Sequence, residues 1–262
     1  MAEISDRAAA GSSAPTISII VPSWHDAENL SALLPVLAGL DGIREIIVAD
    51  AGGDAATEHL ARRHGAILCS CPAPNRGAQM NLGARAASAD MLLFQHADTE
   101  LTARHVSAID LACREPAVIG GAFFRKFDDR HPRLMWLEQF ARFLTRNGGT
   151  LYGDQSVFVR REVFSQLDGF AEIPLMEDME FSRRLRAAGK VVVLDPPVGT
   201  SSRRHSREGA WRKTIQNGLF ILLYKIGVSP RRLHRWYYAE RPASGRQADK
   251  SFPQEPSVAS ER

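Results

Sequence analysis

The sequence predicts an α/β fold, in which helices flank a mainly parallel sheet and a single domain holds them all. Short runs of β-branched apolar residues alternate with longer stretches whose apolar residues recur at helical spacing. Capping residues and glycines separate the two kinds of stretch. The chain has 262 residues and is 44% hydrophobic, which is enough for one large core. Repeated strand–helix–strand units give parallel strands with helices on both faces.

The first half of the chain shows the clearest alternation. Asp26 and Asp54 are expected to cap helices, because an Asp side chain can accept hydrogen bonds from the N–H groups of the first turn. The helix after Asp26 extends to Leu40 and contains Pro35, which favours a kink. The helix after Asp54 ends at Gly65. The other expected elements are the strands Ile17–Pro22, Glu45–Asp50, Ala66–Ser70 and Asp90–Gln95 and the helix Gly77–Ser88.

The second half is less regular. A glycine-rich loop, residues 147–154, separates an aromatic-rich helix from a short strand. The expected strands are Val118–Phe127, Ser156–Arg160 and Lys190–Leu194. The expected helices are Arg133–Arg146, Glu177–Ala188 and the amphipathic segment Glu208–Ile226.

The chain divides into a main unit and three flanking segments. Residues 16–207 are expected to form the single compact domain, and residues 208–241 a basic, amphipathic helical segment. The Ala-, Ser- and Gly-rich residues 1–15 are expected to be a disordered leader, and residues 242–262 a disordered tail.

Composition excludes several classes of protein. No apolar run approaches the roughly 20 residues of a membrane-spanning helix, and the N-terminus lacks the pattern of a secretory signal. Three cysteines form an odd and sparse set, which is typical of a reducing compartment rather than a disulfide framework. We therefore expect a cytoplasmic protein.

Basic charge is concentrated near the C-terminus. Residues 201–241 contain ten Lys/Arg and two Asp/Glu, a net charge of +8, whereas the whole chain carries +3. The rest of the chain therefore has a net charge of −5, which argues against a nucleic-acid partner. The segment either packs on the core with a solvated basic edge or contacts anionic lipid at the inner face of the plasma membrane. Its expected apolar face consists of Ile215, Leu219, Leu222, Leu223 and Ile226.

Polar residues follow three of the expected strands. Residues 23–28 follow the first strand, Asp50 ends the second, and His96-Ala97-Asp98 follow the fourth. Taken alone, each acidic residue could be a helix cap or a solvated loop residue. Because ligands bind at the carboxyl ends of strands in open parallel sheets, their convergence favours a site for a cation, a ribose, or both.

Several motifs, taken in order, resemble those of the family 2 glycosyltransferases, which have the GT-A fold. The resemblance spans roughly residues 16–225 and implies a GT-A-like enzyme. It would transfer a sugar, with inversion, from a nucleoside diphosphate donor, expected to be a UDP-sugar, to a hydroxyl of a small molecule or lipid. The strings Arg76–Asn81 and Pro174–Asp178 look most like a bacterial subgroup named for arsenosugar biosynthesis and often found beside radical-SAM proteins. The motifs are Ser18–Ser23, Glu28–Leu30, Ile47–Asp54, Asn75–Gly83, Leu93–Thr99, Gly153–Gln155 and Pro174–Asp178.

The resemblance implies a nucleotide-sugar pocket along this edge. Asp50 would contact the base or the ribose. Arg76 and Gly77 suit a diphosphate, because a guanidinium forks onto phosphate oxygens and a glycine lets the backbone approach. The implied donor-binding residues are Pro22, Ser23, Glu28, Asp50, Arg76, Gly77, Asn81, His96, Ala97 and Asp98.

The string His96-Ala97-Asp98 aligns with the family's D-x-D metal motif, with His in place of the first Asp. Residues two apart on an extended segment face the same way, so both could meet one Mn²⁺ or Mg²⁺ ion. The resemblance makes Asp98 a metal ligand. Three roles are open for His96. It could be a nitrogen ligand beside the Asp98 oxygen, a combination that favours Mn²⁺. It could instead be a hydrogen-bond donor to phosphate, or an ordinary exposed histidine. His205 is either a further ligand or part of a solvated basic loop.

The resemblance also assigns the acceptor side. It makes Asp178 the general base that takes the proton of the acceptor hydroxyl, with Glu177 beside it. Because Asp178 lies at an expected helix start, we expect the helix dipole to keep its pKa low. Asp154 and Gln155 would contact the acceptor.

Two other functions stay open. A nucleotidyltransferase shares a nucleotide-binding sheet, but it normally has a glycine-rich, basic loop after the first strand. Here that loop, residues 23–28, has no Gly and no Lys. A non-catalytic, membrane-associated relative is suggested by His96 in place of an Asp.

Overall fold

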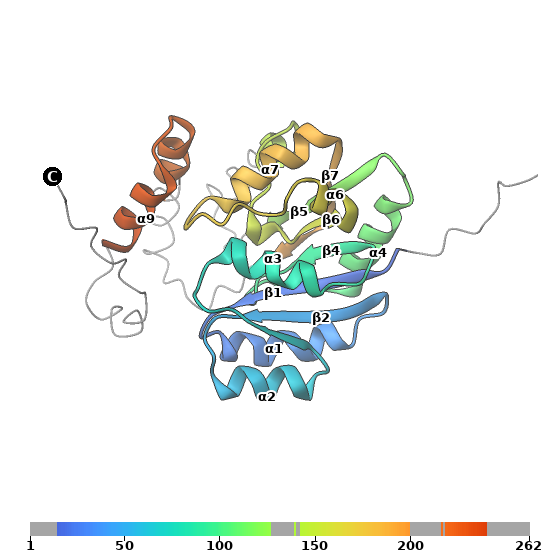
Figure 1. Cartoon of the computed structure of the whole chain (residues 1–262). Coiled ribbons are helices and arrows are strands. Elements are labelled where there is room, and N and C mark those ends of the chain that lie inside the picture. Colours follow the sequence, from blue (N-terminus) through green and yellow to red (C-terminus); the bar gives the residue numbers. More distant parts are fainter. Residues whose placement is uncertain (1–14, 127–138, 140–141, 200–215, 217, 240–262) are drawn as a thin grey trace, which may run out of the picture.

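The computed structural model describes residues 15–126, 139, 142–199, 216 and 218–239, and it contains a seven-stranded sheet (Figure 1). All seven expected strands are present, with boundaries that differ by a few residues. The strands are β1 (Ile17–Ser23), β2 (Ile43–Asp50), β3 (Ile67–Ser70), β4 (Met91–Phe94), β5 (Val118–Lys126), β6 (Val157–Arg160) and β7 (Lys190–Gly199).

The order across the sheet is β3-β2-β1-β4-β6-β5-β7. The pairs β1–β2, β1–β4, β2–β3 and β5–β7 are parallel, whereas β6 is antiparallel to both β4 and β5. Among these seven strands β6 alone is reversed. The mainly parallel α/β sheet predicted from the sequence is therefore confirmed.

The helices that pack on this sheet include two that the sequence did not predict, α4 and α6. Asp54 caps α2 as expected, since its Oδ1 accepts from Thr57 N at 2.8 Å. Asp26 makes no capping bond, and its Oδ1 accepts from Asn29 Nδ2 at 3.1 Å instead. The bounds are α1 (Ala27–Ala38), α2 (Ala55–Arg63), α3 (Arg76–Ala86), α4 (Ala103–Cys113), α6 (Arg161–Gln166) and α7 (Glu177–Ala188), with a 3₁₀ turn, η1 (Gly153–Gln155).

The core forms two layers, one on each face of the sheet. Along β1, Ile19 and Val21 face one layer and Ile20 faces the other, as the period of two in a strand requires. The first layer takes side chains from α1 and α4, including Leu34 and Ile109. The second takes side chains from α3, α6 and α7. Helices therefore cover both faces, and the carboxyl ends of β1, β2 and β4 remain available for a site.

The C-terminal part is described only from residue 216. Residues 218–225 are helical and precede α9 (Pro230–Ala239). Residues 216–239 are called the C-terminal helix pair below. In this pair the ring of Phe220 meets that of Tyr237 edge-on with centroids 5.7 Å apart, and Leu233 is buried. Within the described residues, we find no helix with the length and apolar character needed to cross a membrane.

Several sequence expectations lie outside the described residues. They are the disordered leader apart from residue 15, the tail over residues 242–262, His205, and residues 208–215 of the amphipathic segment. The same holds for residues 133–138 and 140–141 of the expected helix Arg133–Arg146, of which residues 139 and 142–146 are helical. Leu40, expected on the apolar face of the first helix, lies beyond the end of α1 but still packs against the core.

Candidate active site

Asp50 ends β2 with one carboxylate oxygen paired and the other unpaired. Its Oδ2 accepts from the backbone N–H groups of Gly52 at 3.1 Å and Gly53 at 2.7 Å. Its Oδ1 is buried and has no hydrogen-bond partner in the described structure. A buried acceptor without a partner costs about 1–3 kcal/mol, so this atom is suited to a donor group on a ligand.

Gln79 on α3 joins the ends of β1 and β2. Its Nε2 donates to Ser23 O at 2.7 Å and to Ala49 O at 2.8 Å. The Ser23 hydroxyl beside it is buried and, like Asp50 Oδ1, lacks a partner among the described residues. Pro22 lies in β1, whereas Glu28 is exposed in the first turn of α1. The sequence analysis missed Gln79.

His96, Ala97 and Asp98 form a turn rather than an extended segment. Thr99 N donates to His96 O at 3.2 Å and closes the turn. The buried side chain of Gln95 holds it, because Gln95 Nε2 donates to Thr99 O at 2.6 Å and Gln95 Oε1 accepts from Ser156 Oγ at 2.7 Å. The argument that residues 96 and 98 face the same way on a strand was therefore wrong, since β4 ends at Phe94.

The His96 imidazole is neutral at neutral pH. Burial, followed by the Arg76 guanidinium, lowers its pKa to about 3, and Asp154 partly opposes the shift. Its Nε2 is buried without a partner among the described residues. A Cβ at Gly153 would lie 2.9 Å from that nitrogen, so a side chain at this position would force the ring to shift. An ordinary exposed histidine, one of the three roles considered, does not match this environment.

The start of α7 carries Glu177 and Asp178. Asp178 Oδ2 accepts from Gly153 N at 2.9 Å, and its Oδ1 accepts from Met179 N at 2.7 Å. Burial, followed by the neighbouring Glu177 carboxylate, raises the pKa of Asp178 to about 6. The expectation of a low pKa from the helix dipole was wrong, because the two backbone donors and Arg76 only partly offset burial.

The backbone of Gly153 lies between His96 and Asp178. A Cβ there would be 2.9 Å from His96 Nε2 and 3.7 Å from Asp178 Oδ2. Arg76 adds a positive charge, with its Nη1 3.5 Å from Glu177 Oε1. The structure thus brings the end of β4, the start of α3 and the start of α7 together around one pocket. This pocket is lined by Arg76, Met80, Phe94, Leu151, Gly153, Val157, Phe170, Glu177, Asp178, Phe181 and Ser182.

Asp154 and Gln155 lie in η1, just before the reversed strand. Asp154 Oδ2 accepts from Arg125 Nη1 at 2.5 Å, and its Oδ1 is buried without a partner in the described structure. Gln155 is buried; its Oε1 accepts from Tyr152 N at 2.8 Å and its Nε2 donates to Phe123 O at 3.1 Å. Gln155 thus pins the loop to β5, whereas Asp154 keeps an acceptor available.

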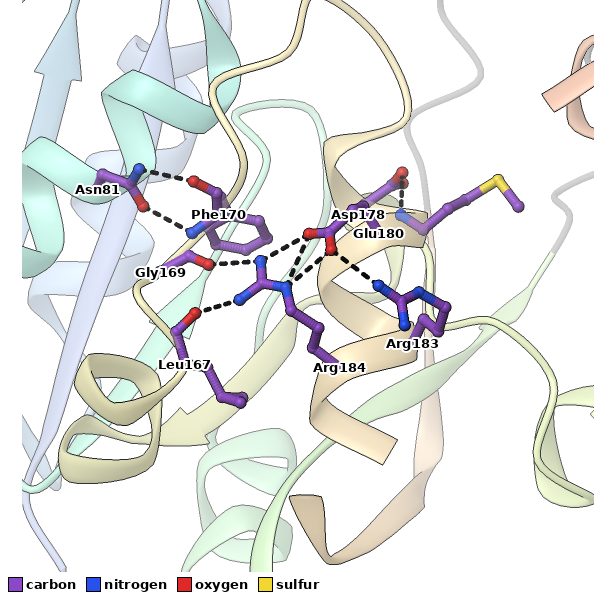
Figure 2. Close-up of polar contacts among 9 residues, drawn as sticks. Asn81, Leu167, Gly169, Phe170, Asp178, Glu180, Arg183 and Arg184 are labelled. Carbon is purple, nitrogen blue, oxygen red and sulfur yellow. Dashed lines mark hydrogen bonds and ion pairs between the residues drawn. The ribbon is translucent and has the colours of Figure 1, made fainter. Parts of the chain in front are cut away.

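Gly77 and Asn81 hold α3 against the chain at residues 170–172. A Cβ on Gly77 would lie 2.5 Å from Ala171 O. Asn81 exchanges two hydrogen bonds with the Phe170 backbone, at 2.9 and 2.8 Å (Figure 2). Both residues pack against protein here, so their proposed contact with a donor has no support in these contacts.

Arg184 on α7 fixes the neighbouring loop, and the sequence analysis missed it. Its guanidinium donates to Leu167 O, to Gly169 O at 2.7 Å and to the Glu180 carboxylate (Figure 2). Asp168 and Gly169 have positive φ angles of 56° and 65°. The hydrogen bonds from Arg184 therefore stabilise the tight turn at residues 167–169, directly beside Asn81.

The sequence family agrees with this geometry. A sequence model described as Glycosyl transferase family 2 matches residues 18–167, more than half of the chain. The chain belongs to this family. The match includes the ends of β1, β2 and β4, which carry Ser23, Asp50 and the 96–98 turn. A glycosyltransferase is therefore the class of enzyme to which this site belongs.

Solved structures show the same fold. A mannosyltransferase from Pyrobaculum calidifontis, in complex with GDP-Man and Mn²⁺, matches with a TM-score of 0.62 and 19% identity over 87% of this chain and 70% of that one. TarS from S. aureus (residues 1–349), in complex with UDP-GlcNAc, gives 0.59 and 16% over 83% and 69%. Glucosyl-3-phosphoglycerate synthase from Mycobacterium tuberculosis, with Mn²⁺, UDP and glucosyl-3-phosphoglycerate, gives 0.54 and 20% over 82% and 81%. No curated protein matches.

For a family 2 glycosyltransferase, the described residues supply few metal ligands. They contain no group of three or more His, Cys, Asp or Glu side chains placed to hold an ion. Asp98 and the neutral His96 share one turn. A divalent ion bound there would need further ligands from elsewhere, and the diphosphate of a bound donor is a chemically suitable source.

Proposed function

We propose that the protein is an inverting glycosyltransferase, which moves a sugar from a nucleoside diphosphate, expected to be UDP, to a hydroxyl acceptor. The observation that carries this proposal is the position of Asp178 across the Gly153 backbone from His96, with its pKa raised to about 6. A carboxylate with a pKa near the working pH is an efficient general base. Asp178 lies near His96 and Arg76, two of the residues that we assign to the donor side.

The donor would bind between the ends of β1 and β2. Asp50 Oδ1 and Ser23 Oγ, both buried without partners among the described residues, can accept from a base N–H or a ribose hydroxyl. Arg76 at the start of α3 would hold the diphosphate, helped by the positive end of the helix dipole. The relatives described above bind GDP-mannose, UDP-GlcNAc or UDP, which supports a nucleotide-sugar donor.

A divalent cation, Mn²⁺ or Mg²⁺, would be held by Asp98 together with the donor diphosphate. The neutral imidazole of His96 fits a ligand or a phosphate donor at the same turn. Bound there, the ion would neutralise charge on the leaving diphosphate. The Mn²⁺ complexes of two relatives support this cofactor. His205, the third proposed ligand, lies outside the described residues.

The chain's own groups would carry out the displacement in one step. The Asp178 carboxylate takes the proton of the acceptor hydroxyl. The hydroxyl oxygen bonds to the anomeric carbon as the bond from that carbon to the diphosphate oxygen breaks, and the nucleoside diphosphate leaves with the electron pair. Asp154 Oδ1, which can still accept a hydrogen bond, would orient the molecule that receives the sugar. Attack from the face opposite the leaving group inverts the anomeric configuration.

Two finer predictions accompany the proposal. From the strings Arg76–Asn81 and Pro174–Asp178, which look most like it, we propose that the chain is nearest the bacterial subgroup named for arsenosugar biosynthesis. The sparse, odd set of cysteines predicts a cytoplasmic location.

The test is a screen of UDP- and GDP-sugars with Mn²⁺, Mg²⁺ or chelator, read by calorimetry and by release of nucleoside diphosphate. We expect metal-dependent donor binding that Asp98→Ala abolishes, and a product of inverted configuration by NMR. Release of pyrophosphate would indicate a nucleotidyltransferase instead. Equal UDP affinity with metal and with chelator would refute the metal assignment, and the absence of any turnover or donor hydrolysis would favour a non-catalytic relative.

A further inference from the structure

The C-terminal helix pair exposes an apolar stripe. Leu219, Leu222 and Ile226 are 52%, 56% and 69% exposed; Leu219 and Leu222 lie on one face of the helix 218–225, and Ile226 directly follows it, with its N–H donating to Leu222 O at 3.0 Å. Trp236 on α9 is 45% exposed. Single exposed apolar residues are common on soluble proteins, but a stripe of several indicates an interaction surface.

The same helix pair carries charge of one sign. Residues 216–239 contain four Lys/Arg and no Asp/Glu. The basic side chains are exposed, so their charge faces outward beside the apolar stripe. They are Lys225, Arg231, Arg232 and Arg235.

An anionic lipid surface fits this combination best. Apolar side chains enter the boundary between headgroups and acyl chains, while Lys and Arg attract the negative headgroups. A second copy of this surface would bring like charges together, and a nucleic acid would leave the apolar stripe exposed to water. The basic charge and the apolar stripe together therefore favour an anionic lipid surface over a second copy of the chain or a nucleic acid.

One residue of the helix pair lies within electrostatic range of the proposed catalytic base. Burial raises the pKa of Tyr224, and after burial the next cause is the Glu180 carboxylate, with a smaller effect from Asp178. The charges in the first two turns of α7 therefore reach Tyr224. In Figure 1, α9 lies on the side of the sheet toward which the arrows of β1 and β2 point. A surface that binds the helix pair would lie close to the mouth of the site.

We propose that the C-terminal helix pair docks on an anionic lipid bilayer and that the acceptor hydroxyl belongs to a molecule held in that bilayer. The docking is independent of the enzyme's reaction, whereas the acceptor assignment rests on the proposed function. A bilayer-bound acceptor would reach Asp178 without leaving the surface. The enclosed donor side, with Asp50 and Ser23, would meet a soluble nucleotide-sugar.

The first experiment measures co-sedimentation of the full chain with vesicles of phosphatidylcholine alone and of equal parts phosphatidylcholine and phosphatidylglycerol. We expect binding to the anionic vesicles only, with release by salt, because the screening length is about 10 Å at 0.1 M salt and about 3 Å at 1 M. Each basic side chain near such a surface contributes about fivefold to binding, so the triple variant Arg231→Gln, Arg232→Gln, Arg235→Gln should bind on the order of 100-fold more weakly.

Two matched controls test the position of the surface. Arg62→Gln with Arg63→Gln removes exposed charge from α2, and Leu111→Gln removes an equally exposed apolar side chain from α4. Neither should change vesicle binding, whereas Leu222→Gln with Ile226→Gln should weaken it several-fold. Equal loss in the α2 variant and the triple variant would refute a dedicated surface, as would negligible binding to both kinds of vesicle. Concentration-dependent dimerisation that the Leu222 and Ile226 changes abolish would identify a second copy as the occupant.

A second measurement separates docking from the reaction. Donor hydrolysis in free solution should be unchanged in the triple variant, whereas transfer to vesicle-borne hydroxyl lipids should fall with vesicle binding. Vesicle binding without any donor turnover would leave docking intact and refute the proposed function. Transfer to vesicle-borne lipid that is insensitive to the triple variant would refute the link between docking and the acceptor.

Discussion

The two halves of the sheet position their site residues by different means. In residues 17–94 every strand is parallel, and Asp50 is oriented by two backbone N–H groups directly after its strand. In residues 118–199 one strand is reversed, and polar side chains such as Gln155 and Arg184 hold the loops. The first half relies mainly on topology, with Gln79 joining two strand ends, whereas the second relies on particular side chains in its loops. The second half should therefore be more sensitive to single polar substitutions.

The largest expected effect is on catalysis in the second half. Asp178→Asn keeps the shape of the side chain but removes its basicity. We expect kcat to fall by about 10²–10⁴-fold, the usual contribution of a positioned general base. Donor affinity measured by calorimetry should be nearly unchanged, because Asp50 and Arg76 are intact. Should Glu177→Gln be the inactive variant while Asp178→Asn retains most activity, the base has been assigned to the wrong carboxylate.

The next effect tests the loop that Arg184 holds. Arg184→Met would leave the carbonyl groups of Leu167 and Gly169 without this donor and would remove one of the two guanidinium groups that meet the Glu180 carboxylate. We expect a loss of about 2–4 kcal/mol in the free energy of unfolding, measured by urea denaturation. Arg183→Met is the matched control, since Arg183 is 74% exposed and meets the same Glu180 at 3.3 Å. Its loss should be no more than about 0.5 kcal/mol; similar losses in both variants would contradict the assignment.

Asp178 should also destabilise the fold at neutral pH. Because its folded pKa is raised from the ordinary 3.8 to about 6, the folded state binds more protons in this window. The free energy of unfolding therefore falls as pH rises from 3.8 to 6, and the penalty is fully present above pH 6. The variant Asp178→Asn has no titrating carboxyl at this position and therefore lacks this penalty. Relative to the parent protein, the variant should gain on the order of 2 kcal/mol between about pH 4 and pH 7. A pH-independent difference in denaturation would contradict the raised pKa.

A smaller effect is expected in the first half. Gln79→Leu removes the donor shared by Ser23 O and Ala49 O. We expect a loss of about 1–2 kcal/mol in the free energy of unfolding, and weaker nucleotide binding because the ends of β1 and β2 are no longer joined. Thermal melting with and without UDP separates the two consequences. If the loss exceeds that of Arg184→Met, the contrast between the two halves is wrong.

The smallest effect is a shift in the pH profile. Glu177→Gln removes the like charge that raises the pKa of Asp178, so that pKa should fall. The acid limb of kcat/KM should then move to lower pH, by about one pH unit or less. Glu172→Gln, on an exposed side chain, provides a control that should leave the limb in place. A shift to higher pH would contradict the electrostatic role of Glu177.

Sequence patterns predict the first half better than the second, for physical reasons. Asp50 could be found because it ends a parallel strand. Gln79 could not, because a glutamine within a helix gives the same pattern whether it is buried or exposed. Asp154 and Gln155 precede a reversed strand, so a search for polar residues after strands does not reach them; only the motif resemblance did.

The pKa of Asp178 could not be predicted from its position at a helix start. A helix dipole contributes about 0.3–1 kcal/mol, whereas burial can shift a pKa by up to 3–5 units. Burial depends on the packing of η1 against α7, which appears only in the folded structure. The helix Glu177–Ala188 itself was predicted with its correct boundaries, because Gly189 ends it.

The reversed strand β6 also bears on how the sheet opens. Only four residues long, it lies between β4 and β5 in the sheet order and pairs with both. The Phe158 ring fills the space where Gly121 on β5 lacks a side chain, since a Cβ there would lie 2.6 Å from the ring. While this strand is intact, the two halves of the sheet should open as one cooperative unit, so their amide protons should exchange with solvent at a single free energy of opening. Shortening Phe158 should divide them into two units that open with separate free energies.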